Sequence, residues 1–194
     1  GGYVVNASSE EGRLAVNGMS NHERESENAN SAIVVTVNPN DFEGKLFGGL
    51  EFQEMLEEQA YKIGKGKIPI QRLSDFLDNK KTDKIGKIKP IFKGGYEFSN
   101  LNEILPDFIA NALKEAFPDF ERKINGFSDD DTILSAIETR TSSPIRILRR
   151  DDGQSEIKGI YPAGEGAGYA GGIMSAAMDG MKIAEYVAEK KCVK

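Results

Sequence analysis

A glycine-rich loop near the C-terminal end constrains the fold of this chain more than any other feature. From residue 163 the sequence reads A-G-E-G-A-G-Y-A-G-G-I-M-S-A-A-M. Glycine adopts positive φ easily and leaves no Cβ between the main chain and a neighbouring group. The apolar pair Ile160-Tyr161 precedes the loop, and small and apolar residues at helical spacing follow it. The pattern predicts a strand, a tight loop and a helix.

The start of this helix is predicted to face an anion or a dipole, because first-turn N–H groups have no partner within a helix. Gly166-Ala-Gly168-Tyr-Ala-Gly171 also matches the G-x-G-x-x-G dinucleotide fingerprint. That fingerprint requires a second strand and an acidic residue about 20 positions further on. The sequence stops at Lys194, before either feature. We therefore expect a fragment of a larger protein, with the nucleotide-binding βαβ unit supplied elsewhere.

Two blocks of sequence resemble FAD-dependent flavoproteins. Residues 163–180, A-G-E-G-A-G-Y-A-G-G-I-M-S-A-A-M-D-G, resemble the C-terminal flavin-contacting motif of glutathione-reductase-like flavoproteins, which have two dinucleotide-binding domains. The similarity is greatest to uncharacterised bacterial FAD-dependent dehydrogenases. Residues 3–37, with N-A-S-S-E-E-G-R-L-A-V-N-G-M-S and E-N-A-N-S-A, resemble the same group.

The resemblance implies a set of FAD contacts in the loop. Glu165 stands where the family has the acid of A-x-G-D that bonds the ribityl chain, and it could alternatively cap loop N–H groups. Gly171-Gly172-Ile173 would provide the N–H groups that face the pyrimidine edge of the isoalloxazine. The implied cofactor-binding residues are Ala163, Gly164, Glu165, Gly166, Gly168, Gly171, Gly172 and Ile173. FAD would be shared with a dinucleotide-binding domain outside these residues.

The fold class predicted is α+β or α/β, in three parts. Residues 1–38 are predicted to supply strands of a flavin-proximal body, 39–143 an inserted, largely helical cap or substrate domain, and 144–194 the returning strand-loop-helix. The first part is predicted to share one body with the last. The predicted strands are 3–5, 14–16, 31–37, 69–71, 145–148 and 157–161, and the predicted helices are 49–63, 75–77 and 102–124.

Three sequence details refine this prediction. The segment 31–37, S-A-I-V-V-T-V, is the clearest strand, and a tight turn at 149–153 should join the last two strands. Pro118 is expected to split the helical region 102–124 in two. Asp129-Asp130-Asp131 is interpreted as the acidic start of a further helix, and only weakly as a metal site.

Two residues are candidates for catalysis. His22 is the only imidazole, and it lies in a polar stretch, residues 18–30, predicted to be a mobile loop or an active-site wall. Arg140, in E-T-R-T-S-S-P, could bind an anionic substrate or face the flavin; the equal alternative is an ion pair with Glu138 or a nearby Asp.

Composition excludes several classes of function. A net charge of −6 and a pI near 5.0 argue against binding nucleic acid or an anionic membrane surface. No apolar run approaches the roughly 20 residues of a membrane span. One cysteine, Cys192, rules out an internal disulfide and suits the cytoplasm, and with a single histidine it leaves no zinc site.

The function implied by the resemblance is that of an FAD-dependent oxidoreductase, a dehydrogenase transferring a hydride through flavin N5. Its partner would be a small-molecule substrate, and NAD(P)H is one candidate for that partner. The 194-residue chain alone is expected to be inactive. The alternative is a non-catalytic α+β binding module. In that case the glycine loop would bind a small anion or allow close helix packing.

Overall fold

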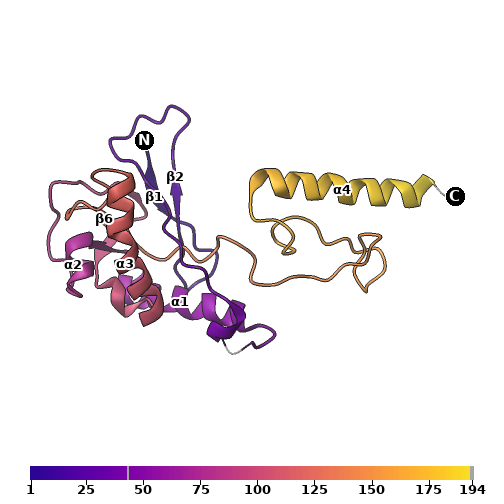
Figure 1. Cartoon of the computed structure of the whole chain (residues 1–194), viewed down its shortest axis with the longest axis horizontal. Helices are drawn as coiled ribbons and strands as arrows, with labels where there is room; N and C mark the ends of the chain where they lie inside the picture. Colours follow the sequence, from indigo (N-terminus) through magenta and orange to yellow (C-terminus); the bar gives the residue numbers. More distant parts are fainter. Residues whose placement is uncertain (43, 193–194) are drawn as a thin grey trace. The chain divides into compact units, whose positions relative to one another are not determined.

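The computed structural model describes residues 1–42 and 44–192, which form two compact units (Figure 1). The first unit comprises Gly1–Asn38 and Phe52–Thr139, and the second comprises Pro39–Glu51 and Arg140–Lys194. Small mixed sheets and helices make up the fold, so the predicted α+β class is confirmed. Within the described residues, no helix is both long enough and apolar enough to cross a membrane.

The first unit contains a small sheet built around the N-terminal strand. β1 (Tyr3–Asn6) pairs antiparallel with β2 (Val16–Met19) and parallel with β4 (Phe92–Lys93). The strand predicted at 3–5 is confirmed. The next strand begins two residues later than predicted, because Leu14 N donates to Glu57 O at 3.0 Å and Ala15 N to Ser8 Oγ at 3.1 Å, and neither N–H pairs with β1.

A second sheet in the same unit is built around β3 (Ile68–Arg72). β5 (Tyr96–Phe98) pairs parallel to β3, and β6 (Ile133–Ser135) pairs antiparallel. The predicted strand at 69–71 and the short helix after it, α2 (Leu73–Leu77), are confirmed. The helix predicted to follow Asp129–Asp131 is wrong, because the chain there runs into β6 and pairs with β3 in the register Ile70↔Ser135.

Two longer helices and a short 3-10 turn complete the first unit. α1 (Gly48–Gly64) begins in the second unit and continues into the first, and η2 (Leu101–Glu103) precedes α3 (Asp107–Lys123). Both long helices were predicted, but α3 continues through Pro118. Phe117 explains this, because its buried ring packs edge-on against Phe76 and Phe120 and holds the helix on the core. The largest fully buried apolar side chains are Leu14, Ile68, Ile70, Leu73 and Phe76.

The second unit contains little regular structure besides its helices. After η1 (Pro39–Phe42) and the start of α1, it resumes at Arg140 and ends in α4 (Ile173–Cys192). The strands predicted at 145–148 and 157–161 are wrong, as is the strand predicted at 31–37 in the first unit. Each has strand composition, but no strand of the described chain pairs with it. The turn predicted at 149–153 is present, closed by a hydrogen bond from Gly153 N to Arg150 O of 2.9 Å.

The N-terminal residues belong to the core of the first unit. Residues 1–38 pack with 52–139, through the pairing of β1 with β4 and through Leu14 and Val16 in the core. The packing is apolar, since the same cluster contains Ile68 and Phe76. The division into a flavin-proximal body, an inserted domain and a returning segment stays a prediction.

Candidate functional site

The glycine-rich loop folds back on itself through two hydrogen bonds. Gly168 N donates to Glu165 O at 2.8 Å, and Tyr169 N donates to Gly164 O at 3.1 Å. Gly164 and Gly168 have φ of 69° and 82°, values that side chains disfavour. A Cβ on Gly168 would also lie 2.5 Å from Ile145 O. Here the backbone conformation and the close approach both require glycine.

An ion pair fixes the beginning of the loop to the middle of α4. The Arg149 guanidinium donates to both oxygens of Asp179, at 2.9 and 2.5 Å, and to Pro162 O at 3.0 Å. Asp179 also accepts from Gly164 N at 2.8 Å. The Arg149 and Asp179 side chains are only 13% and 11% exposed. The hydrogen bond from Arg149 outweighs the opposing effect of burial and, with that from Gly164, lowers the pKa of Asp179 to about 2.

A recess lies beside this ion pair, next to the ring of Tyr169. The guanidinium carbons of Arg149 and Arg146 lie 3.6 and 4.5 Å from the ring centroid, within cation–π range. The recess has a volume of about 300 Å³ and is lined by Ser142, Ser143, Arg146, Gly168, Tyr169, Ala170 and Gly171. It therefore combines hydroxyl groups, one cation and exposed backbone.

Glu165 is exposed, and its carboxylate forms no hydrogen bond or ion pair within residues 1–42 and 44–192. The alternative interpretation, in which Glu165 caps loop N–H groups, is therefore wrong. Asp179 does this instead, through Gly164 N.

The N-terminus of α4 is open to solvent. Ile173, its first residue, is 90% exposed, and the first backbone hydrogen bond into the helix is from Ala176 N to Gly172 O at 2.9 Å. The N–H groups before Ala176 belong to the first turn, where helices leave donors unsatisfied. A Cβ on Gly166 would meet nothing within 4 Å, so the loop also leaves space for another group.

The candidate catalytic residues lie in different units. His22 is exposed in the first unit, and Arg140 is exposed at the start of the second, to which the glycine loop also belongs. Glu138 is ion-paired with no described residue, so its predicted pair with Arg140 is not formed; burial raises the pKa of Glu138. The prediction for the Cys192 thiol concerns a side chain outside the described part of the chain.

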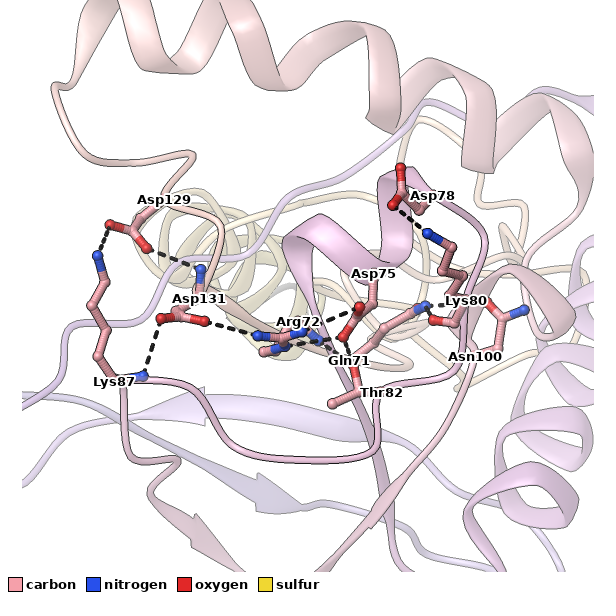
Figure 2. A network of polar contacts seen from close by, with 10 residues as sticks. All are labelled: Gln71, Arg72, Asp75, Asp78, Lys80, Thr82, Lys87, Asn100, Asp129 and Asp131. Atoms are coloured by element: carbon pink, nitrogen blue, oxygen red, sulfur yellow. Dashed lines mark hydrogen bonds and ion pairs between the residues drawn. The ribbon is translucent and has the colours of Figure 1, made fainter.

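A separate polar network occupies the first unit (Figure 2). Arg72 binds Asp75 and Asp131, at 3.0 and 3.2 Å, and Thr82 Oγ1 donates to Asp75 at 2.7 Å. Burial opposes ionisation of Asp75, but the bonds from Arg72 and Thr82 outweigh it and lower the pKa of Asp75. The carboxylates of this network bind cationic and hydroxyl groups of the chain itself. The network therefore holds β3, α2 and the turn at residues 129–131 together.

Sequence reasoning missed Arg149, Tyr169 and Asp179. The signal for Asp179 was present, because it is the only charged side chain between Ile173 and Met181 in an otherwise small and apolar stretch. A lone acid on such a helix usually has a cationic or N–H partner. Nothing comparable marked Arg149, which stands among several charged residues.

Residues 1–141 match the family described as "FAD-dependent protein, C-terminal domain-like", and the chain belongs to this family. A similar protein from Clostridium beijerinckii, described only as "Uncharacterized protein", is 51% identical over 194 residues. That alignment covers 98% of this chain but 36% of the relative, so the chain spans little more than a third of the relative's length. The family match ends before the glycine loop, whereas the relative's alignment covers nearly the whole chain.

Proposed function

We propose that this chain is the C-terminal part of an FAD-dependent oxidoreductase and that residues 163–173 contact the flavin. Membership of an FAD-dependent protein family carries the proposal. The arrangement of the loop supports it, because the exposed glycines Gly166 and Gly171 leave backbone open before the N-terminus of α4.

The residues present fit an FAD contact site. Flavin binding at a loop needs backbone free of side chains and an acceptor for a ribityl hydroxyl. Gly166 has open space where a Cβ would point, and the Glu165 carboxylate is exposed and accepts nothing from the described chain. Gly171 and Gly172 lie directly before α4, and Ile173 is its first residue.

Bound FAD would supply the hydride-transfer chemistry, through N5. This chain would contribute orientation and electrostatics. The positive end of the α4 dipole would stabilise negative charge beside it, and the Arg149–Asp179 ion pair would hold the loop in place. A small-molecule substrate, NAD(P)H as a redox partner, and roles for Arg140 and His22 are further parts of the proposal.

Substitutions at Glu165 test the flavin contact in the longer polypeptide that we propose contains this chain. A hydrogen bond to a carboxylate contributes about 1.5–3 kcal/mol, so Glu165→Ala should weaken FAD binding roughly ten- to hundredfold. Glu165→Gln should weaken it less, and Glu165→Asp should leave it near the original value. Glu156→Ala removes the same charge from another exposed position and is the matched control. Equal FAD affinity in all variants would remove Glu165 from the cofactor site.

A second test uses the 194-residue chain alone. Because much FAD affinity comes from pyrophosphate binding at a βαβ unit, the chain alone should bind FAD weakly or not at all. Gel filtration after incubation with FAD, followed by an absorbance spectrum, measures this. A chain that stays yellow would contradict the proposed sharing of the cofactor.

The alternative, a module that binds a small anion without catalysis, is supported by the recess beside Arg146. Titration with inorganic phosphate would separate the two functions. Two results together would favour the anion module: phosphate binding that is lost in Arg146→Ala, and a longer protein without flavin absorbance. Flavin absorbance in the purified longer protein would favour the oxidoreductase.

A further inference from the structure

The segment 31–37, S-A-I-V-V-T-V, has the side-chain pattern of a strand but pairs with no strand of the described chain. Ile33, Val35 and Val37 are half-buried, whereas Ala32, Val34 and Thr36 are exposed. Burial that alternates with a period of two is the pattern of a strand with one covered face. Ile33 packs against the core of the first unit, which explains which face is covered.

The backbone of this segment is not paired with the described chain. Within the described residues, no N–H or C=O group of residues 31–37 forms a hydrogen bond. The residue before it is nevertheless anchored, because Asn30 Nδ2 donates to Tyr3 O at 2.9 Å and to Met19 O at 3.0 Å. Because buried backbone groups are almost always paired in native proteins, a neighbouring strand would satisfy those groups of this segment that water does not reach.

The segment also lacks the features that protect free strand edges. It contains no charged residue, proline or glycine, and Val34 is 63% exposed. Uncharged, β-branched segments with open edges pair readily with other chains and promote aggregation. An edge of this composition is therefore expected to be covered in the native protein.

We propose that residues 31–37 become a strand by pairing with a strand from the part of the polypeptide that lies outside these 194 residues. The relative from Clostridium beijerinckii shows that such a part exists in a similar protein, since the alignment covers 36% of its length. A partner on the same polypeptide has a high effective concentration, which favours it over a second copy. The partner strand would carry apolar side chains at alternate positions, as cross-strand neighbours of Val34 on the same face. The inference does not depend on flavin binding.

Hydrogen–deuterium exchange tests the pairing directly. The amides of residues 32–37 should all exchange rapidly in the 194-residue chain, and every second one, on the paired edge, should exchange at least about tenfold more slowly in the longer protein. Amides of β3, paired in this chain, serve as the internal control. Equal exchange at 32–37 in both proteins would overturn the proposal. Protection that rises with the concentration of the 194-residue chain would also overturn it, because it would identify a second copy as the partner.

Proline substitution provides a second test and locates the paired edge. Neighbouring residues of a strand direct their N–H groups to opposite edges, so Val34→Pro and Val35→Pro each remove a donor from a different edge. At least one should lower the melting temperature of the longer protein more than that of the 194-residue chain. Val34→Thr, which keeps the N–H and the β-branched shape, is the matched control. Equal shifts in both proteins for both prolines would contradict the pairing.

Discussion

The two units of this chain are stabilised in different ways. In the first, large apolar side chains such as Leu14, Ile70 and Phe76 are fully buried between two small sheets and the helices. In the second, the buried apolar side chains among the described residues are Pro162, Ala167 and Ile183, and the loops are held to α4 by polar contacts. The most shielded of these contacts is the Arg149–Asp179 ion pair, whereas the pair of Lys190 with Asp152 is exposed.

The second unit also exposes more of its apolar side chains. Ile173, Met174, Met178 and Met181 are exposed at helical spacing along α4. Apolar burial is the dominant favourable contribution to folding, so a unit with so little of it depends on a few polar contacts for its conformation. In the first unit, stability should therefore fall most when a substitution removes apolar volume. In the second unit, it should fall most when a substitution breaks an ion pair.

The largest expected effect is in the core of the first unit. Phe76 is 1% exposed and packs edge-on against Phe117, with ring centroids 6.5 Å apart. Phe76→Ala should lower the free energy of unfolding by about 3–5 kcal/mol, because it removes buried contacts and leaves a cavity. Met178→Ala, at a side chain 67% exposed on α4, should change it by less than about 0.5 kcal/mol. Urea unfolding followed by circular dichroism measures both, and similar losses would contradict the comparison.

The next largest effect is expected at Asp179. Asp179→Asn leaves the shielded Arg149 guanidinium without its anion, which should destabilise the second unit by about 3 kcal/mol. Limited proteolysis within residues 163–172 should accordingly accelerate about hundredfold. Asp152→Asn is the control, because its ion pair with Lys190 is about 40% exposed on both sides and contributes little. Equal acceleration in the two variants would show that the Arg149 ion pair has no special role.

Acid should weaken the same contact. The pKa of Asp179 is lowered to about 2 in the folded chain, whereas an unfolded aspartate titrates near 3.9. A carboxyl with a lowered pKa contributes its stabilisation above the unfolded pKa and loses it as the pH falls through the folded pKa. The contribution, at most about 2.5 kcal/mol, should therefore be complete above pH 5 and lost between about pH 4 and 2. NMR titration of the Asp179 carboxyl carbon measures the pKa, and a midpoint near 4 would contradict the ion pair.

The smallest of these effects is expected in the glycine loop. Gly168→Ala forces a side chain onto a positive φ and towards Ile145 O, and should cost about 1–2 kcal/mol. Gly166→Ala meets open space and should leave the melting temperature unchanged. If Gly166→Ala nevertheless weakens FAD binding in the longer protein, the space beside it belongs to the cofactor. Equal destabilisation by both substitutions would contradict the loop geometry.

Elements whose signals are local could be predicted from the residues alone. Apolar spacing predicted α1 and α3, and β-branched composition with flanking turn residues predicted β1 and β3. The need for glycine at positions 164 and 168 was also visible, because repeated glycines before a helix indicate a tight backbone conformation. These features depend on residues near one another in the chain, so a single sequence contains the information.

Features that depend on distant partners could be read from the folded chain and not from its sequence. The same strand composition forms a strand at residues 3–6, where β4 lies alongside, and none at 31–37, where the described chain offers no neighbour. Asp129–Asp131 leads into β6 and not into a helix, because β3 provides hydrogen bonds for it. Arg149 and Asp179 lie 30 positions apart and meet only when the loop folds onto α4. A strand needs an edge and an ion pair needs a counter-charge, and neither partner can be predicted from local sequence.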